Sequence, residues 1–180
     1  MTPTKFFLTN GAGIHKDYLA SFELALREAG IEQFNLVSVS SILPPGCKRI
    51  PKAKGLELLS PGEVVFIVLA RNASNEPNRL LSASVGCAIP SQNNHYGYLS
   101  EHHSFGETYE KAGDYSEDLA ASMLASTLGL KFNPDEAWDS RRQAFRLSGK
   151  IVRTTNMTQT ARGDKHGRWT SVVAAAVFIP

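Results

Sequence analysis

The chain has 180 residues, 42% of them hydrophobic and 20% charged, which is enough to bury one core, so we expect a single domain covering residues 1–180. The net charge is only +2 and the basic residues are scattered, which argues against a nucleic-acid-binding protein. No apolar stretch approaches the ~20 residues that span a bilayer and the N-terminus has no signal-peptide core, so we expect a cytoplasmic protein without membrane contact.

In the first half of the chain, apolar residues recur at steps of three and four before Gly30, which is typical of an amphipathic helix with a C-terminal glycine cap. The pair Ser40-Ser41 lies at the end of an alternating strand, just before the breaker at 44–46. The predicted elements are a strand at 5–9, a glycine turn at 10–13, a helix ending at Gly30, a strand at 34–42 and an irregular basic connection at 47–61.

The second half of the chain is mainly β in pattern. The predicted elements are a strand at 63–71, a polar turn at 72–78, a strand at 80–89 that pairs with 63–71, a strand at 96–104, a helix capped by Ser116 and ending before Gly129, an ambiguous segment at 134–145, and strands at 147–160 and 169–179 joined as a hairpin by 163–167. Two main helices against about seven strands predict an α+β layered sandwich. The two cysteines, Cys47 and Cys87, are expected to be free thiols.

A histidine-rich patch offers one candidate site. Alternate residues of a strand share a face, so Glu101 and His103 could bind a metal with His95, whereas His102 would face away. The patch lacks a tight spacing such as HExxH, and histidines at the surface or at an interface are the simpler interpretation. A Ser–His–Asp hydrolase is a weaker alternative because no serine lies in a G-x-S-x-G elbow.

The serine pair offers a different chemistry. The hydroxyl of Ser41 could attack the preceding carbonyl and turn the amide into an ester, and elimination followed by hydrolysis would leave a pyruvoyl ketone. Ser41 alone needs its hydroxyl, while Ser40 would become the C-terminus of the shorter fragment. From the residues alone, a polar turn remains the simpler interpretation.

Five segments, taken in order, resemble the pyruvoyl-dependent arginine decarboxylases. The most specific is 35–45 (NLVSVSSILPP), which is similar to that family's self-cleavage site. Weaker matches are 22–31 (FELALREAGI), 81–90 (LSASVGCAIP), 97–101 (GYLSE) and 172–177 (VVAAAV).

This resemblance implies an αββα sandwich with mostly antiparallel sheets, assembled as an (αβ)3 trimer with active sites at subunit interfaces. It implies cleavage into a β chain of residues 1–40 and an α chain of residues 41–180, which begins with the pyruvoyl group derived from Ser41. No metal is implied. The implied site residues are Glu101 as proton donor, Asn35 in support of processing and of the site, Glu23 for the guanidinium of arginine, and Leu19 and Leu26 as its apolar companions.

The residues themselves suit several of these roles. A pyruvoyl ketone forms a Schiff base with an α-amine and acts as an electron sink, and the α-carbon then needs a proton from an acid such as Glu101. A carboxylate at Glu23 suits a planar guanidinium, although the family usually has a shorter aspartate there. Asn35 lies six residues before Ser41, about 20 Å in an extended strand, so we expect it to serve a neighbouring subunit.

The sequence therefore predicts a self-processing enzyme that converts L-arginine to agmatine and CO2. Three alternatives remain: a decarboxylase of another basic amino acid, a trimeric binding or scaffold protein that does not cleave, and a metal-dependent hydrolase. The roles of Cys47, Cys87, His102 and His103 are not predicted.

Overall fold

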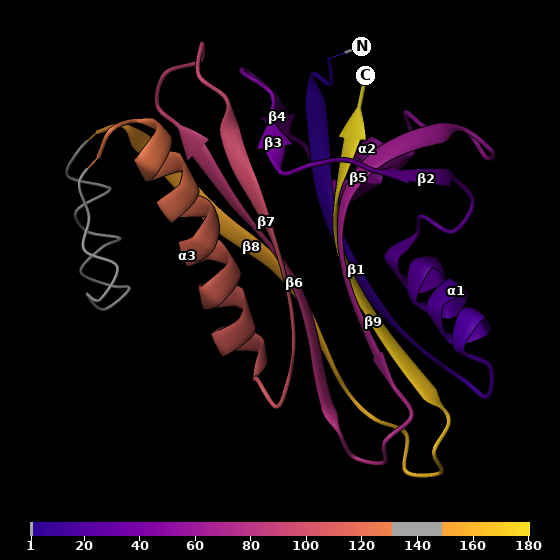
Figure 1. The fold of residues 1–180 in the computed structure, drawn as a ribbon. Coiled ribbons are helices and arrows are strands. Elements are labelled where there is room, and N and C mark those ends of the chain that lie inside the picture. Colours follow the sequence, from indigo (N-terminus) through magenta and orange to yellow (C-terminus); the bar gives the residue numbers. More distant parts are fainter. Residues whose placement is uncertain (1, 131–148) are drawn as a thin grey trace.

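The computed structural model describes residues 2–130 and 149–180, which form two β-sheets packed face to face with a helix on each outer face (Figure 1). This confirms the predicted α+β sandwich with mostly antiparallel sheets and two main helices. The helices are α1 (Tyr18–Ala29), α2 (Lys52–Leu56) and α3 (Tyr109–Thr127). The strands are β1 (Lys5–His15), β2 (Asn35–Ser38), β3 (Ile42–Leu43), β4 (Lys48–Arg49), β5 (Val64–Ser74), β6 (Leu80–Pro90), β7 (Gly97–Phe105), β8 (Ile151–Arg162) and β9 (Trp169–Ile179).

The first sheet has the strand order β2-β5-β9-β1-β4, and the second has the order β3-β7-β6-β8. Among the described strands, only β1 with β4 and β2 with β5 pair in parallel; the other pairs are antiparallel. None of the described helices is long and apolar enough to cross a bilayer.

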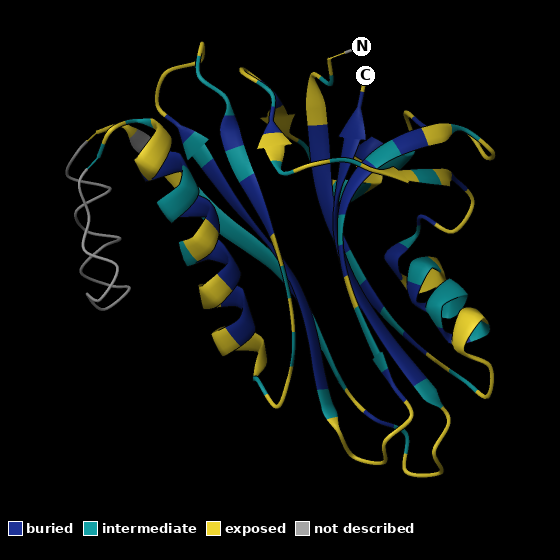
Figure 2. Cartoon of the chain, in the orientation of Figure 1, coloured by how far each residue is buried: buried dark blue, intermediate teal, exposed yellow. Residues whose placement is uncertain are grey.

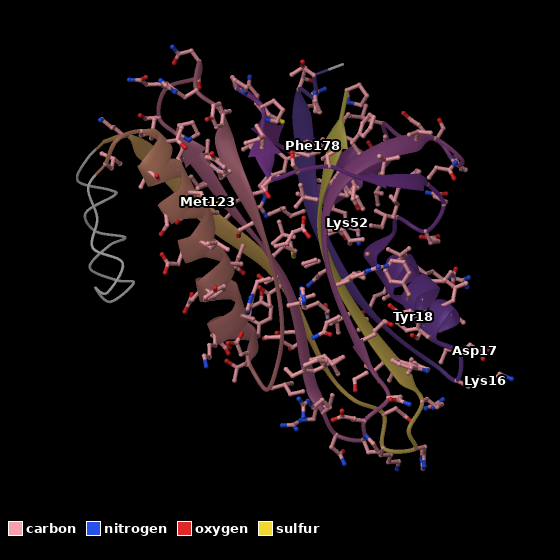
Figure 3. The ribbon with its side chains drawn as sticks, viewed as in Figure 1. Lys16, Asp17, Tyr18, Lys52, Met123 and Phe178 are labelled. Atoms are coloured by element: carbon pink, nitrogen blue, oxygen red, sulfur yellow. The ribbon has the colours of Figure 1, made fainter. Side chains whose placement is uncertain are left out.

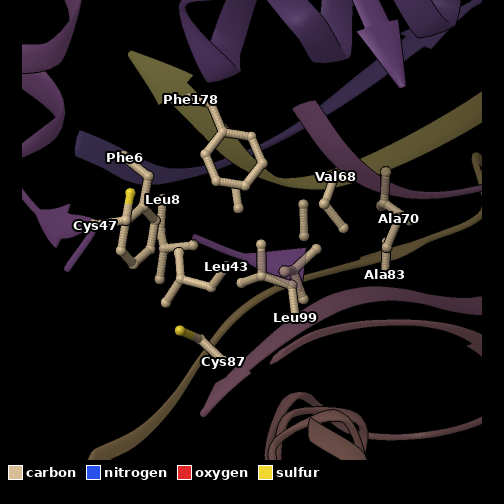
Figure 4. Close-up of a cluster of buried hydrophobic side chains, with 14 of the residues drawn as sticks. Phe6, Leu8, Leu43, Cys47, Val68, Ala70, Ala83, Cys87, Leu99 and Phe178 are labelled. Atoms are coloured by element: carbon tan, nitrogen blue, oxygen red, sulfur yellow. The ribbon is translucent and has the colours of Figure 1, made fainter. Parts of the chain in front are cut away.

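The main core lies between the two sheets, because alternate residues of each strand point inward (Figures 2 and 4). Phe6 and Leu8 of β1 meet Leu99 of β7 there. Apolar residues on the other face of the first sheet pack against α1, and a smaller cluster rich in alanine joins the second sheet to α3. Cys47 and Cys87 are both buried and free, as predicted.

Gly11 and Gly13 were expected to turn the chain, but β1 continues through them to His15. They are needed for packing: a Cβ on Gly11 would lie 2.2 Å from the carbonyl oxygen of Ala25, and one on Gly13 would lie 2.2 Å from that of Ser21. The helix α1 therefore rests directly on the backbone of β1. Its predicted end is confirmed, because Gly30 caps it in the left-handed conformation with φ 73°.

Two predicted strand pairings are wrong. The strands β5 and β6 are neighbours in sequence but belong to different sheets. The same is true of β8 and β9, so the turn at 163–167 crosses between sheets instead of closing a hairpin. The expected strand at 34–42 is likewise two short strands in different sheets. β1 and β5 instead pair with β9, and β6 pairs with β8, while β6 and β7 are consecutive strands that do pair.

The predicted start of the second main helix is also wrong. The helix α3 begins at Tyr109, where the hydroxyl of Thr108 accepts a hydrogen bond from the Lys111 amide. Ser116 lies in its buried middle, where its hydroxyl bonds the Gly113 carbonyl and Ser84. The connection at 47–61 contains β4 and α2, and the ambiguous segment at 134–145 lies outside the described residues.

Candidate active site

The pair Ser40-Ser41 forms the crossing from the first sheet to the second. The strand β2 ends at Ser38 on the edge of the first sheet, and β3 starts at Ile42 on the edge of the second. The amide of Val39 donates to the carbonyl of Ile67 at 2.9 Å, and the carbonyl of Ser41 accepts from the amide of Leu99 at 2.8 Å. The crossing is therefore hydrogen-bonded to the first sheet at Val39 and to the second sheet at Ser41.

The backbone at the pair forms a tight turn. The amide of Ile42 donates to the carbonyl oxygen of Ser40 at 2.9 Å, an i→i+2 bond with Ser41 at its centre. Among the described residues other than glycine, only Asn78 has a positive φ, so this is an inverse γ-turn. The side chain of Ser40 is exposed and that of Ser41 is half-buried.

Glu101 lies on the same strand that holds Ser41. It follows Leu99 by two residues on β7, so both side chains point to the inner face of the second sheet, where Glu101 is opposite Val85. The partner strand β3 covers only Gly97 and Tyr98, which leaves Glu101 at an open sheet edge. Desolvation nevertheless raises the pKa of Glu101, and the nearby His103 opposes this rise.

The α1 residues lie apart from these groups. Leu19 is 74% exposed, and Glu23 and Leu26 are half-buried on a helix that packs against the outer face of the first sheet. The Glu23 carboxylate forms an ion pair with Arg27 at 2.6 Å. That hydrogen bond is the main cause of a raised pKa of Arg27. A guanidinium thus already binds the carboxylate that was predicted to receive one.

A hollow of about 420 Å³ runs between α1 and the open edge of β7. Its lining includes Tyr18 and Phe22 of α1 and His103 of β7, but neither Ser41 nor Glu101. Figure 3 places Tyr18 with Lys16 and Asp17 where β1 leads into α1. The predicted site residues therefore form two groups within one protomer.

Asn35 also lies away from Ser41. It begins β2, its side chain is exposed, and its Nδ2 donates to the carbonyl of Gly62 at 2.7 Å. The strand carries the chain away from it toward the crossing. Direct contact between Asn35 and Ser41 is not made within the protomer.

The metal-site alternative gains no support from the geometry. His95 lies in the connection before β7 and lines a different cavity from the one beside His103. In the described part of the chain, no group of three or more His, Cys, Asp and Glu side chains could hold a metal ion.

A polar cluster behind β7 was not foreseen from the sequence. The Nε2 atom of His102 lies 2.7 Å from Oε2 of Glu107, and Ser104 donates to the same oxygen at 2.7 Å. Both hydrogen bonds lower the pKa of Glu107, and the His102 ring packs at a tilt of 41° against Tyr115 of α3, with the ring centroids 4.4 Å apart. Strand alternation did indicate that His102 faces away from Glu101, but not that α3 would meet it there.

Comparison with known proteins identifies the family. The model of the family described as pyruvoyl-dependent arginine decarboxylase matches residues 5–180. The probable pyruvoyl-dependent arginine decarboxylase of Chloroherpeton thalassium is 57% identical over 178 residues, 99% of this chain and 98% of that protein. Pyruvoyl-dependent arginine decarboxylase 2 of Methanosarcina mazei is 59% identical over 179 residues, with the same shares covered. The resemblance is confirmed, and the chain belongs to the pyruvoyl-dependent arginine decarboxylases, a family of carboxy-lyases.

Proposed function

We propose that the chain is the precursor of a pyruvoyl-dependent enzyme that converts L-arginine to agmatine and CO2. The precursor cuts itself between Ser40 and Ser41 into a β chain of residues 1–40 and an α chain of residues 41–180. The main support is the anchoring of the crossing, by Val39 on the first sheet and by Ser41 on the second. Because of this anchoring, a cut leaves both new ends attached to the fold.

Ser41 carries out the cut with its own side chain. Its Oγ adds to the carbonyl carbon of Ser40, the C–N bond breaks, and the amide becomes an ester with a free amine on residue 41. Loss of the α-proton and of the Cβ–O bond releases the Ser40 carboxylate and leaves dehydroalanine. Water then replaces the nitrogen, which departs as ammonia, and the pyruvoyl ketone remains.

The turn at Ser41 must open before this attack. An inverse γ-turn has φ of about −75°, which places Cβ of Ser41 nearly opposite the carbonyl carbon of Ser40 across the N–Cα bond. Rotation about that bond brings Oγ toward the carbonyl and breaks the hydrogen bond from Ile42. A neutral hydrogen bond contributes only about 1 kcal/mol, so this turn is a small obstacle.

The residues present fit a pyruvoyl group, because Ser41 supplies its carbon atoms and the amide of Leu99 donates a hydrogen bond to the carbonyl oxygen of Ser41. When formed, the group supplies an electron sink through a Schiff base with the substrate's α-amine. Glu101 holds the proton for the α-carbon: its raised pKa keeps the carboxyl protonated to higher pH than an ordinary glutamate. It lies two residues from Leu99 on the same face.

A neighbouring subunit supplies the rest of the site in an (αβ)3 trimer. Leu19, Glu23 and Leu26 serve the pyruvoyl group of the next protomer, since in their own they lie on the outer face of the first sheet, whereas Glu101 lies on the inner face of the second. The exposed Leu19 gives this face an apolar surface that a subunit contact would cover. The carboxylate of Glu23 receives the substrate guanidinium as it now receives that of Arg27.

The test begins with a denaturing gel and intact mass measurement. The expected result is two fragments that meet at Ser40/Ser41, the larger lacking a free α-amine. Release of labelled CO2 is then measured with arginine, lysine, ornithine and histidine, and arginine is expected to react fastest. A chain that stays at 19.6 kDa after long incubation would overturn the proposal and favour the scaffold alternative. A cleaved protein that prefers another basic amino acid would correct the substrate alone.

A further inference from the structure

A second cavity lies outside the proposed active site. It has a volume of about 540 Å³ and opens between the β3–β4 segment, the connection from β6 to β7, and β8. Its walls are partly apolar, with Leu43, Ile89 and Pro90, and partly polar, with amide and hydroxyl groups of residues 91–93. Neither cleavage nor decarboxylation, as proposed above, uses this cavity.

The charged groups around this cavity are all basic. Lys48, Arg49, Arg153 and His95 line it, and no Asp or Glu is among the described lining residues. Nη1 of Arg49 lies 3.4 Å from the hydroxyl of Thr155, a long contact with a neutral group. In the part of the chain that the structure describes, the two arginines and Lys48 form no ion pair with a carboxylate.

The two arginines approach the cavity from opposite sheets. Arg49 lies on β4, the edge strand of the first sheet, and Arg153 lies on β8, the edge strand of the second, opposite Ile89. Burial raises the pKa of Cys87 to about 12, and both guanidinium groups oppose this rise. The two positive charges thus lie near the same buried thiol, which Figure 4 shows in the core cluster with Cys47. Both arginines are exposed, so water weakens their mutual repulsion, and an anion placed between them would be attracted by both.

We propose that this cavity binds a small anion of the phosphate type, either inorganic phosphate or a phosphate ester, between Arg49 and Arg153. A tetrahedral phosphate has enough acceptor oxygens for two guanidinium groups on facing sheets, whereas a single carboxylate has only two oxygens. Lys48 adds a third positive charge. The volume and the apolar wall leave room for the organic part of an ester.

Calorimetric titration of the mature protein with inorganic phosphate, and separately with a sugar phosphate, tests this at low ionic strength. One saturable site per protomer is expected. Arg153→Gln and Arg49→Gln should each weaken binding at least about tenfold, because each removes charged hydrogen bonds, and Arg153→Lys should weaken it less. The matched control is Arg162→Gln, an exposed position at the other end of β8, which should bind as the wild type does.

Absence of saturable binding by the wild type would overturn the proposal, and so would equal losses in the Arg153 and Arg162 variants. Thermal unfolding midpoints of all variants show whether each protein is folded. Tighter binding of the sugar phosphate would identify the ester as the ligand, and equal binding would indicate recognition of the phosphate alone. The uncleaved Ser41→Ala precursor should bind phosphate equally well, so the result does not depend on decarboxylase activity.

Discussion

The amide of Ile42 donates to the carbonyl oxygen of Ser40 at 2.9 Å, and Ser41 lies between them. The turn uses only the backbone of Ser40, whose side chain is exposed. We therefore predict that Ser40→Ala still cleaves and that Ser41→Ala, the matched variant one residue later, does not. Denaturing gels over time distinguish the two, and fragments from Ser41→Ala at this bond would contradict the proposed nucleophile.

The raised pKa of Glu101 predicts how the activity of the mature enzyme depends on pH. If Glu101 is the proton donor, as proposed, its neutral carboxyl is the active form, so kcat should fall as pH rises through the raised pKa and remain higher below it. Replacement of His103 by Gln removes a charge that lowers this pKa, so the fall should move to higher pH. Profiles of kcat against pH for both proteins provide the measurement.

Glu101→Gln should lower kcat by about 10²- to 10⁴-fold, because the side chain can no longer donate a proton. Self-cleavage should continue, since the proposed cut uses the Ser41 hydroxyl and the Ser40 carbonyl. Gels and CO2 release, measured on one preparation, separate the two effects. Undiminished decarboxylation by this variant would exclude Glu101 as the donor.

The pair formed by Glu23 and Arg27 should compete with the substrate. Exposed ion pairs are weak, so Arg27→Leu is expected to lower the KM for arginine only about two- to fivefold, with kcat little changed. Glu23→Gln should raise KM because it removes the carboxylate itself. A rise in KM for Arg27→Leu would show instead that Arg27 holds Glu23 in position.

The separation of Asn35 from Ser41 predicts complementation between subunits. Neither Asn35→Ala nor Ser41→Ala trimers should decarboxylate well alone. Mixed trimers should recover cleavage of the Asn35→Ala chains, because a Ser41→Ala neighbour supplies the missing amide. Mass spectrometry of the mixture measures this, with each homotrimer as the control. No recovery would place the role of Asn35 within its own chain.

The close approach of α1 to β1 predicts a stability change. A Cβ added by Gly11→Ala would lie 2.2 Å from the carbonyl oxygen of Ala25, so the helix must shift. Overpacking of this kind costs about 1–3 kcal/mol, which chemical denaturation would measure. An unchanged denaturation midpoint would show that the helix moves without cost.

Strand alternation predicted which residues share a face, but it could not assign strands to sheets. It correctly placed Glu101 and His103 together and His102 opposite. It wrongly paired β5 with β6 and β8 with β9, because the chain passes from one sheet to the other at both of these connections. The pattern of Gly11 and Gly13 suggested a turn, since only the packed helix reveals why a side chain is excluded.

The family could be identified from the sequence, but the geometry of the candidate site could not. The run around Ser40-Ser41 could be identified through a family resemblance, whereas the residues alone gave only a polar turn. The separation of Glu23 from Glu101 depends on which side of a sheet each element covers. Tertiary packing determines this, and no local pattern records it.

The strand order of the first sheet would make the proposed cleavage a one-way step for folding. Residues 1–40 contribute β1 and β2, and every neighbour of these strands, β4, β5 and β9, comes from residues 41–180. The precursor can refold as one chain at a rate independent of concentration. The cut protein, once unfolded, must bring two separate molecules together before these strands can pair, so its recovery should slow on dilution.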